Sequence, residues 1–410
     1  MLDTAFSPWP SFTDEEADAV RRVILSNRVN YWTGGECREF EKEFAAWCGA
    51  QYAIALANGT LALDLALKAL GVGPGDEVVV TPRTFMASVS CVVNAGARPI
   101  FADVEAASGN ISARTIAAVL SARTKAIVCV HLAGWPCDMD GIMALAEEHG
   151  LKVIEDCAQA HGARYRGRSV GTLGHIGAWS FCQDKIMSTG GEGGMVTTND
   201  RALWAAMWSY KDHGKSWESV YERRHPPGFR WLHDGFGSNF RMLEVQAVIG
   251  RIQLRRMAAW TAQRNANARA IAEVCARHPV LHVPTFACRV DCPARCAQAE
   301  ACVHAQYKFY AYVRAEQLAD GWTRDRLVEE INRRGVPCYH GSCPEVYMEK
   351  AFDGGGRPAQ RLPVARMLGE SSLMFLVHPT LTAGDIVETC RVLDQVAGEA
   401  ARPSTREAAC

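Results

Sequence analysis

Residues 125–156 read KAIVCVHLAGWPCDMDGIMALAEEHGLKVIED and alternate between two kinds of pattern. The apolar runs at Lys125–Leu132 and Lys152–Glu155 have the length and composition of buried strands, and Asp140–His149 between them is typical of a helix. A strand, a helix and a second strand in this order predict two parallel strands joined by a crossover connection. This unit therefore favours an α/β fold.

The same alternation continues on both sides of this unit. Leu61–Leu70 is rich in Ala and Leu and predicts a helix. Further strand-like runs stand at Glu77–Thr81, Arg98–Val104, Gly177–Phe181 and Met195–Thr198. Short, almost wholly apolar strands separated by helices indicate a mostly parallel sheet with helices on both faces.

The chain is long enough for two domains. It has 410 residues, of which 48% are hydrophobic, and single cores rarely grow to that size. Met242–Arg277 predicts one long helix or two, and the pattern after it changes to a strand at Lys308–Arg314 and a helix at Arg324–Arg334. We therefore expect a large domain over residues 1–254, a smaller α+β domain over 255–397 and a flexible tail over 398–410.

Composition argues against several classes of partner. The 44 basic and 45 acidic residues give a formal net charge of −1, which offers no argument for binding to nucleic acid or to an anionic membrane. No segment resembles a signal peptide, and no apolar run reaches the roughly 20 residues that cross a bilayer. We expect a cytoplasmic protein whose sixteen cysteines do not form a disulfide framework.

Asn58-Gly59-Thr60 comes directly before the predicted helix Leu61–Leu70. The N-terminus of a helix offers free backbone N–H groups and a partial positive charge, which suit a phosphate group. The hydroxyl of Thr60 adds a further donor. Because N-caps are common, these three residues on their own are explained more simply as an ordinary helix start.

Asp156 follows the predicted strand Lys152–Glu155 in the sequence IEDCAQAHGA. In an open parallel sheet, ligands bind beyond the carboxyl ends of the strands, so an acid at this position can face a cofactor. Gln159 lies three residues further on and can reach the same place. Asp156 can also be read as an N-cap, and Glu155 is a second acid, although strand alternation points Glu155 the other way.

Lys185 lies in WSFCQDKIMSTGGEGG, residues 179–194, after a predicted strand and before a glycine-rich turn. The residue order of a Walker loop is absent, so Lys185 is either a solvated loop lysine or a lysine that forms a Schiff base. Ser180 can join Thr60 at a phosphate group. Phe85, in PRTFMAS, can stack on an aromatic ligand or pack in the core.

These motifs occur in one order along the chain. Asn58-Gly59-Thr60 is followed by GPGDEVVVTPRTFMA (73–87), VHLAGWPCDMD (130–140), IEDCAQAHGA (154–163), SFCQDK (180–185), TGGEGG (189–194) and GSNFRM (237–242). Together they closely resemble the DegT/DnrJ/StrS family of sugar aminotransferases, strongly over about residues 25–260 and loosely elsewhere. The resemblance implies a homodimeric fold-type I transferase that uses pyridoxal 5'-phosphate, with a mostly parallel seven-stranded sheet and a smaller C-terminal α+β domain.

The resemblance also implies a role for each matching residue. Lys185 corresponds to the lysine that carries the cofactor as a Schiff base, and Asp156 to the acid that keeps the pyridine nitrogen protonated. Phe85 corresponds to the aromatic residue that stacks on the ring, and Gln159 to the glutamine near the ring hydroxyl. The phosphate ligands implied are Thr60 and Ser180, together with Asn239 of the partner subunit, and Gly59 and Leu61 are further implied contacts of the cofactor.

The implied reaction moves an amino group from glutamate or glutamine to a keto sugar attached to a nucleotide, in the synthesis of amino sugars for a surface polysaccharide or an antibiotic. A cyclitol ketone of the scyllo-inosose type is an alternative acceptor that would use the same residues. A non-enzymatic regulatory protein is a further alternative, against which stands the absence of a basic stripe. Lysine at position 185 favours transamination, because a dehydratase branch of the family has histidine there.

Two positions depart from the family pattern, and several residues remain open as substrate contacts. Leu61 stands where the family usually has Ala, and Gln183-Asp184 stands where it usually has a Pro-Thr-like pair. The candidate substrate contacts, each of which can equally be structural, are His131, His161, His213, Arg241 and His378.

The segment Phe286–Lys308 contains four cysteines, with a histidine nearby: Cys288, Cys292, Cys296, Cys302 and His304. Their spacings of four, four and six do not match common zinc patterns, in which CxxC pairs dominate. We expect an insertion loop and no metal ion, and keep a metal or redox site as the alternative.

Overall fold

The computed structural model describes residues 6–284 and 301–403. Its larger sheet has seven strands in the order β1-β9-β8-β5-β4-β2-β3. Their bounds are β1 Tyr52–Leu56, β9 Gly194–Thr198, β8 Ile176–Ser180, β5 Lys152–Asp156, β4 Thr124–Val130, β2 Glu77–Val80 and β3 Arg98–Phe101. Only β9 runs antiparallel to its neighbours β1 and β8, while the other pairs are parallel. The predicted mostly parallel sheet is therefore confirmed.

Helices cover both faces of this sheet, as the strand β1 illustrates. Ile54 and Leu56 pack in one core cluster with α3 (Gly59–Ala69), α4 (Ala87–Asn94) and α7 (Arg201–Tyr210). Ala53 and Ala55 point the other way, into a cluster with α2 (Glu36–Cys48) and α8 (Glu244–Cys275). At strands β4 and β5, residues of α5 (Ala113–Ala117) and α6 (Met139–Glu148) pack against the sheet. Burial on two faces explains why the strands are apolar throughout.

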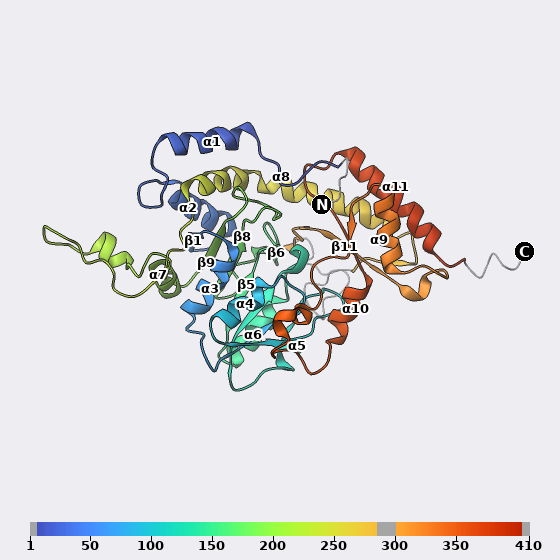
Figure 1. The fold of residues 1–410 in the computed structure, drawn as a ribbon, viewed down its shortest axis with the longest axis horizontal. Coiled ribbons are helices and arrows are strands. Elements are labelled where there is room, and N and C mark those ends of the chain that lie inside the picture. Colours follow the sequence, from blue (N-terminus) through green and yellow to red (C-terminus); the bar gives the residue numbers. More distant parts are fainter. Residues whose placement is uncertain (1–5, 285–300, 404–410) are drawn as a thin grey trace, which may run out of the picture.

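A second, antiparallel sheet has the strand order β10-β11-β13-β12. Its strands are β10 Leu281–His282, β11 Phe309–Val313, β13 Ser372–Phe375 and β12 Cys338–Tyr339, and the accompanying helices are α9 Arg324–Arg333, α10 Pro363–Ser371 and α11 Ala383–Ala400. The single long helix α8 runs along the larger sheet and continues to this unit, where it contacts β11 and α11 (Figure 1).

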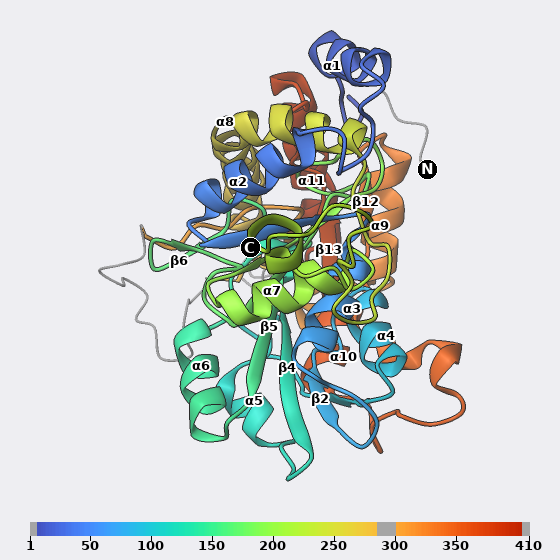
Figure 2. The same ribbon diagram turned by 90° about the vertical axis from the view of Figure 1, so that its left-hand side faces the viewer.

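The remaining elements lie at the periphery. Helix α1 (Asp14–Leu25) packs on α8, and the segment 213–238, which follows α7, projects away from the body at the left of Figure 1. Figure 2 looks onto this side of the molecule, with α7 in front. Short elements are the hairpin β6 (Arg164–Tyr165) and β7 (Arg168–Ser169) and single helical turns at Leu132–Gly134, Glu218–Glu222, Ala315–Gln317, Val346–Met348 and Lys350–Phe352.

Some predicted boundaries differ from the structure. The strand predicted over Arg98–Val104 ends at Phe101, and Asp156 is the last residue of β5 rather than the first residue after it. The boundary predicted between residues 254 and 255 falls inside α8, and the division into two domains stays a prediction. The tail predicted from residue 398 begins too early because α11 continues to Ala400, and residues 404–410 lie outside the described residues. No helix in the described part of the chain is long and apolar enough to span a membrane.

Candidate active site

A cavity of about 520 Å³ opens where the carboxyl ends of β5 and β8 meet the N-terminus of α3. This is the edge at which an open parallel sheet places its ligands. The cavity brings together eight residues singled out in the sequence: Gly59, Thr60, Leu61, Phe85, Asp156, Gln159, Ser180 and Lys185.

The N-terminus of α3 lies directly against the end of β8. A Cβ atom on Gly59 would stand 2.5 Å from the Cβ of Ser180, so the helix can approach the strand this closely only with glycine at position 59. Asn58 is the N-cap, and its Oδ1 accepts a hydrogen bond from the N–H of Leu61 at 3.0 Å. The earlier N–H groups of a helix have no acceptor within the helix itself, so Gly59 and Thr60 can offer donors to an anion.

Asp156 is held in a fixed orientation at the buried end of the cavity. Its side chain accepts hydrogen bonds from Ser88 Oγ at 2.7 Å and from the N–H of Ala158 at 3.1 Å. Ser88 Oγ in turn lies 2.7 Å from the hydroxyl of Thr84. Among residues 6–284 and 301–403, hydrogen bonds rather than a salt bridge orient this carboxylate, and it presents an acceptor to a ligand in the cavity.

A hydrogen bond from the backbone orients the side-chain amide of Gln159. Its Oε1 accepts a hydrogen bond from the N–H of Ala133 at 2.7 Å, and Ala133 adopts the left-handed conformation, with φ of 55°. Because Oε1 accepts this bond, the amide nitrogen is the donor that Gln159 can offer to a ligand.

Lys185 reaches the cavity from the loop after β8. Its side chain is 16% exposed, and Nζ lies 3.4 Å from Asp184 Oδ1 and 5.4 Å from the centroid of the Tyr307 ring. The hydroxyl of Tyr307 donates a hydrogen bond to Asp184 Oδ2. Trp9 Nε1 also donates a hydrogen bond to the backbone carbonyl oxygen of Lys185, at 2.8 Å. The amine is thus partly shielded from water and bordered by one carboxylate.

Asp184 keeps a negative charge beside this amine. Burial raises the pKa of its carboxyl group, but the charge of Lys185 and the hydrogen bond from Tyr307 outweigh burial and lower that pKa below its ordinary value. Phe85 also lines the cavity and is 70% exposed, so its ring can stack on a ligand there.

Two histidines considered as substrate contacts are buried outside the cavity lining. His161 packs against Trp179 and Phe181, with ring centroids 5.2 and 5.5 Å away, and burial followed by the charge of Lys185 lowers its pKa to about 3. His378 stacks on Trp9 at 5.8 Å, and its Nδ1 lies 2.9 Å from the hydroxyl of Thr380.

The other candidates lie at the base of the projecting segment 213–238. Arg241 forms a salt bridge of 2.7 Å with the buried Asp212, and the backbone of Asp212 pairs with that of Asn239. His213 and Asn239 are exposed. None of these residues lines the cavity of its own chain.

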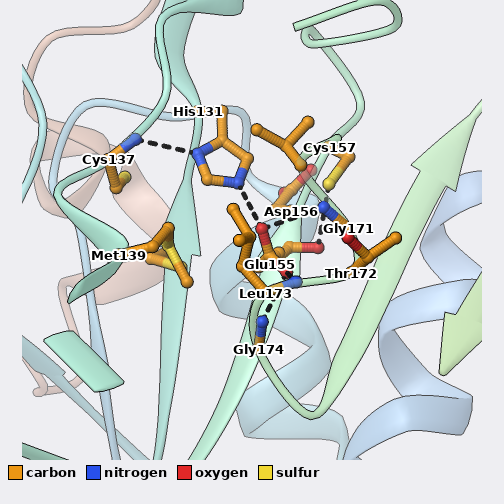
Figure 3. A network of polar contacts seen from close by, with 12 residues as sticks. His131, Cys137, Met139, Glu155, Asp156, Cys157, Gly171, Thr172, Leu173 and Gly174 are labelled. Carbon is orange, nitrogen blue, oxygen red and sulfur yellow. Dashed lines mark hydrogen bonds and ion pairs between the residues drawn. The ribbon is translucent and has the colours of Figure 1, made fainter. Parts of the chain in front are cut away.

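Glu155 and His131 form a separate, buried polar network that does not line the cavity (Figure 3). His131 Nε2 lies 3.0 Å from Glu155, whose carboxylate also accepts the N–H groups of Gly171, Leu173 and Gly174 at 2.6–2.9 Å. His131 Nδ1 accepts the N–H of Cys137 at 3.0 Å. Burial raises the pKa of Glu155, but its hydrogen bond with His131 and the backbone donors outweigh burial and lower it.

This network shows that Glu155 points away from the cavity, as strand alternation predicted. His131, Glu155 and Cys157 are close enough to bind a metal ion together. However, the Glu155 oxygens and His131 Nδ1 already accept backbone N–H groups, so a metal would have to displace bonds that fix the turn at residues 171–174. The arrangement is that of a structural network.

The cysteine-rich segment is only partly described. Cys288, Cys292 and Cys296 lie outside the described residues, whereas Cys302 Sγ accepts the N–H of Arg166 at 3.2 Å. His304 packs against Trp135, its Nδ1 accepts the N–H of Gln306 at 2.9 Å, and burial lowers its pKa to about 3.

Sequence reasoning missed several residues of the site. Ser88 and Thr84 lie in the quoted motif around Phe85, but no signal marked them as partners of Asp156. Tyr307 reaches Asp184 from a segment more than a hundred residues away, and such a contact leaves no trace in a local pattern.

Comparisons with known proteins agree with this geometry. Residues 10–394 match the model of the DegT/DnrJ/EryC1/StrS aminotransferase family. GDP-perosamine synthase of Caulobacter vibrioides is 37% identical over 364 residues, which are 87% of this chain and 89% of that protein. The dTDP-3-amino-3,4,6-trideoxy-alpha-D-glucose transaminase of Streptomyces venezuelae is 32% identical over 92% of this chain and 90% of its own. The X-ray structure of the aminotransferase from Psychrobacter cryohalolentis matches with a TM-score of 0.92 and 63% identity, over 96% of this chain and 99% of that one.

Proposed function

This chain belongs to the DegT/DnrJ/EryC1/StrS aminotransferase family and is a pyridoxal-phosphate-dependent aminotransferase, and we propose that it transfers an amino group from glutamate or glutamine to a keto sugar linked to a nucleoside diphosphate. Relatives named as a GDP-perosamine synthase and a dTDP-amino-sugar transaminase support this acceptor class. The observation that carries the proposal is the meeting of the α3 N-terminus, Asp156 and Lys185 in one cavity. The product would be an amino sugar for a surface polysaccharide or an antibiotic.

The residues of the cavity fit the cofactor. The close approach of Gly59 to Ser180 makes a cradle of backbone N–H groups and a hydroxyl, which suits the phosphate. Asp156 suits the pyridine nitrogen because its carboxylate is oriented but not neutralised by a cation. Phe85 would stack on the ring, the Gln159 amide would donate to the ring hydroxyl, and Lys185 would hold the cofactor covalently. Leu61 would contribute less than predicted, because its N–H is already bonded to Asn58.

The protein residues then have distinct tasks during the reaction. Bound pyridoxal phosphate supplies an electron sink for the charge that develops on the donor α-carbon. The amino group of the donor would displace Lys185 from the cofactor and so free its amine. Lys185 Nζ would then take a proton from the donor α-carbon and return it to the atom on the far side of the nitrogen, and the partial burial of the amine keeps bulk water from competing for the proton. The keto acid leaves before the keto sugar enters, and the same groups act in reverse, so we expect ping-pong kinetics.

We further propose that the enzyme works as a homodimer in which Asn239 contributes to the phosphate site of the partner subunit. Asn239 is exposed and lies outside the cavity of its own chain, at the base of the projecting segment 213–238. That segment carries Phe229, Trp231 and Phe236, which are 77%, 80% and 103% exposed. Large apolar side chains that project together into solvent favour burial against another subunit. A cytoplasmic location stays a prediction.

A panel of nucleotide-linked keto sugars, each offered with glutamate and with glutamine, tests the proposal. We expect an amino sugar nucleotide with at least one member of the panel, detected by mass spectrometry, and NMR of the product identifies the aminated carbon. Transfer to a keto inositol but to none of the nucleotide sugars would contradict the acceptor class and leave the aminotransferase assignment intact.

A further inference from the structure

A cluster of positive charge lies beside Lys185, on the side of Tyr307. Lys185 Nζ is 5.4 Å from the centroid of the Tyr307 ring, and Lys308 Nζ is 5.1 Å from the same centroid. Arg264, on α8, donates through Nη1 to the carbonyl oxygens of Gln306 and Tyr307 at 3.4 and 3.3 Å. Three cationic side chains from three distant segments therefore surround one tyrosine.

Two of these cations lack a charge partner. Arg264 is 1% exposed, and among the described residues no acceptor lies within hydrogen-bond distance of its Nε or Nη2. In residues 6–284 and 301–403, no carboxylate lies within ion-pair distance of Lys308 or Arg264. Asp184 is the acid beside the cluster, and it is already bonded to Lys185 and Tyr307.

His378, which lies beside this cluster, adds no further positive charge to it. Burial, and then the charges of Arg264 and Lys308, lower the pKa of His378 to about 3, so that this histidine is neutral near pH 7. Burial and the charge of Arg264 also lower the pKa of Lys308 to about 8. Charges that are held out of water without a partner are costly, and in proteins such sites are often where an anionic ligand supplies the missing charge.

We propose that Lys308 and Arg264 form the subsite for a carboxylate of the amino donor, next to the Lys185 amine at which the donor reacts. The inference rests on the proposed aminotransferase reaction and names the residues that recognise its donor. Lys308 and Arg264 do not line the cavity itself but stand at Tyr307, which Lys185 also contacts. The chemical class that fits is an amino acid with a second carboxylate, because these are two separate cations and glutamate offers two carboxylates.

The other anions of the reaction fit this place less well. The phosphate of the cofactor suits the α3 N-terminus, where Gly59 and Ser180 meet, whereas Lys308 and Arg264 lie beyond Lys185 and Tyr307. A nucleoside diphosphate is bulky and needs an open surface, but Arg264 is almost completely enclosed. A carboxylate is small, and in an amino acid it is only two bonds from the nitrogen that reacts.

Binding of glutarate to the holoenzyme tests the inference without turnover, because glutarate has both carboxylates of glutamate but no amino group. In calorimetric titrations, we expect Lys308→Met to weaken glutarate binding by about 10- to 100-fold, the effect of removing a hydrogen bond to a charged group. Lys308→Arg, which keeps the charge, should restore most of the affinity. Lys42→Met is the matched control, since Lys42 lies on the surface with its side chain 71% exposed.

Steady-state kinetics separate this subsite from the acceptor site. We expect Lys308→Met to raise KM for glutamate and to leave KM for the nucleotide-linked keto sugar unchanged. Unchanged glutarate affinity, or a rise confined to KM for the keto sugar, would overturn the inference. If the wild-type enzyme binds glutarate through Lys308 but aminates no nucleotide sugar, the acceptor class fails while the donor subsite stands. Lys308 is the better target because Arg264 also supports the backbone of residues 306–307.

Discussion

The Oγ atom of Ser88 lies 2.7 Å from Oδ2 of Asp156, so a hydroxyl on α4 sets the orientation of the acid at the end of β5. Both side chains are almost completely buried. A buried carboxylate that loses a hydrogen-bond donor keeps the free-energy cost of its removal from water, but it loses part of the hydrogen bonding that offsets this cost.

Ser88→Ala should therefore weaken the hold of the protein on its cofactor. We expect about a tenfold loss of affinity for pyridoxal phosphate, equivalent to one hydrogen bond to a charged group, with a smaller effect on thermal stability. Titration of the apoprotein followed by protein fluorescence measures this affinity. Ser90→Ala is the control, because Ser90 lies on the same helix and its Oγ donates to the carbonyl oxygen of Ala87, at 3.5 Å, instead of to Asp156.

Gly59→Ala should remove the phosphate cradle. The added Cβ would meet the Cβ and backbone of Ser180 at 2.5–3.0 Å, so α3 must move away from β8. We expect cofactor affinity to fall by at least about tenfold, since overpacking at a close contact commonly costs 1–3 kcal/mol. Gly354→Ala, where an added Cβ meets nothing within 4 Å, is the matched control. Equal affinity in both variants would show that the cradle is not the phosphate site.

Lys185→Ala should abolish both the covalent hold on the cofactor and the proton transfer. We expect turnover to fall by at least about 10³-fold, within the usual range for the loss of a positioned acid–base group. Borohydride reduction followed by mass spectrometry should add the mass of the cofactor to Lys185 in the wild type and nothing in the variant. Lys152→Ala, at the exposed opposite end of β5, should behave as the wild type.

Mixing two inactive variants tests whether the active sites are shared. If Asn239 serves the partner subunit, a dimer of one Lys185→Ala and one Asn239→Ala chain has one site with both residues intact. Random mixing should then restore about a quarter of the wild-type activity, because half of the dimers are mixed and each has one good site. If both residues served the same chain, mixing would restore nothing.

The affinity for glutarate should depend on pH through Lys308. The pKa of Lys308 is lowered to about 8, so its side chain is positively charged below pH 8 and loses this charge as the pH rises through that value. We therefore expect binding to weaken above about pH 8, and Lys308→Arg to bind independently of pH over this range. The charged or titratable groups that face Lys308 are Lys185, Asp184, Arg264, Tyr307 and His378, and these are the same in both proteins.

The sequence was sufficient for the features that repeat locally. Apolar runs such as Lys152–Glu155 lie between two helical layers, and this burial on both faces leaves a pattern that can be read directly. Taken alone, cavity residues such as Gly59 and Lys185 also had simpler structural explanations, and their prediction depended on the order of the motifs and the family resemblance that this order carries.

The partners of these residues could not be predicted in the same way. Ser88 contacts Asp156 across 68 positions and Tyr307 contacts Asp184 across 123, so each pair depends on how separate elements pack. The four candidate histidines and Arg241 do not line the cavity. Their polarity suggested substrate contacts, but polarity alone does not show whether a side chain points into the cavity or away from it. Helix α8 runs from the larger sheet to the smaller one without a break, so the boundary expected between residues 254 and 255 falls inside a single element.

The hydrogen bond from Trp9 to the carbonyl oxygen of Lys185 has a practical consequence for anyone who purifies the enzyme. The indole also contacts Trp260, His378 and Arg264, so Trp9 packs against the loop that carries Lys185. A change at Trp9 would therefore disturb the loop of Lys185, although the two residues are 176 positions apart. Protein used for activity assays should keep Trp9 and its contacts intact.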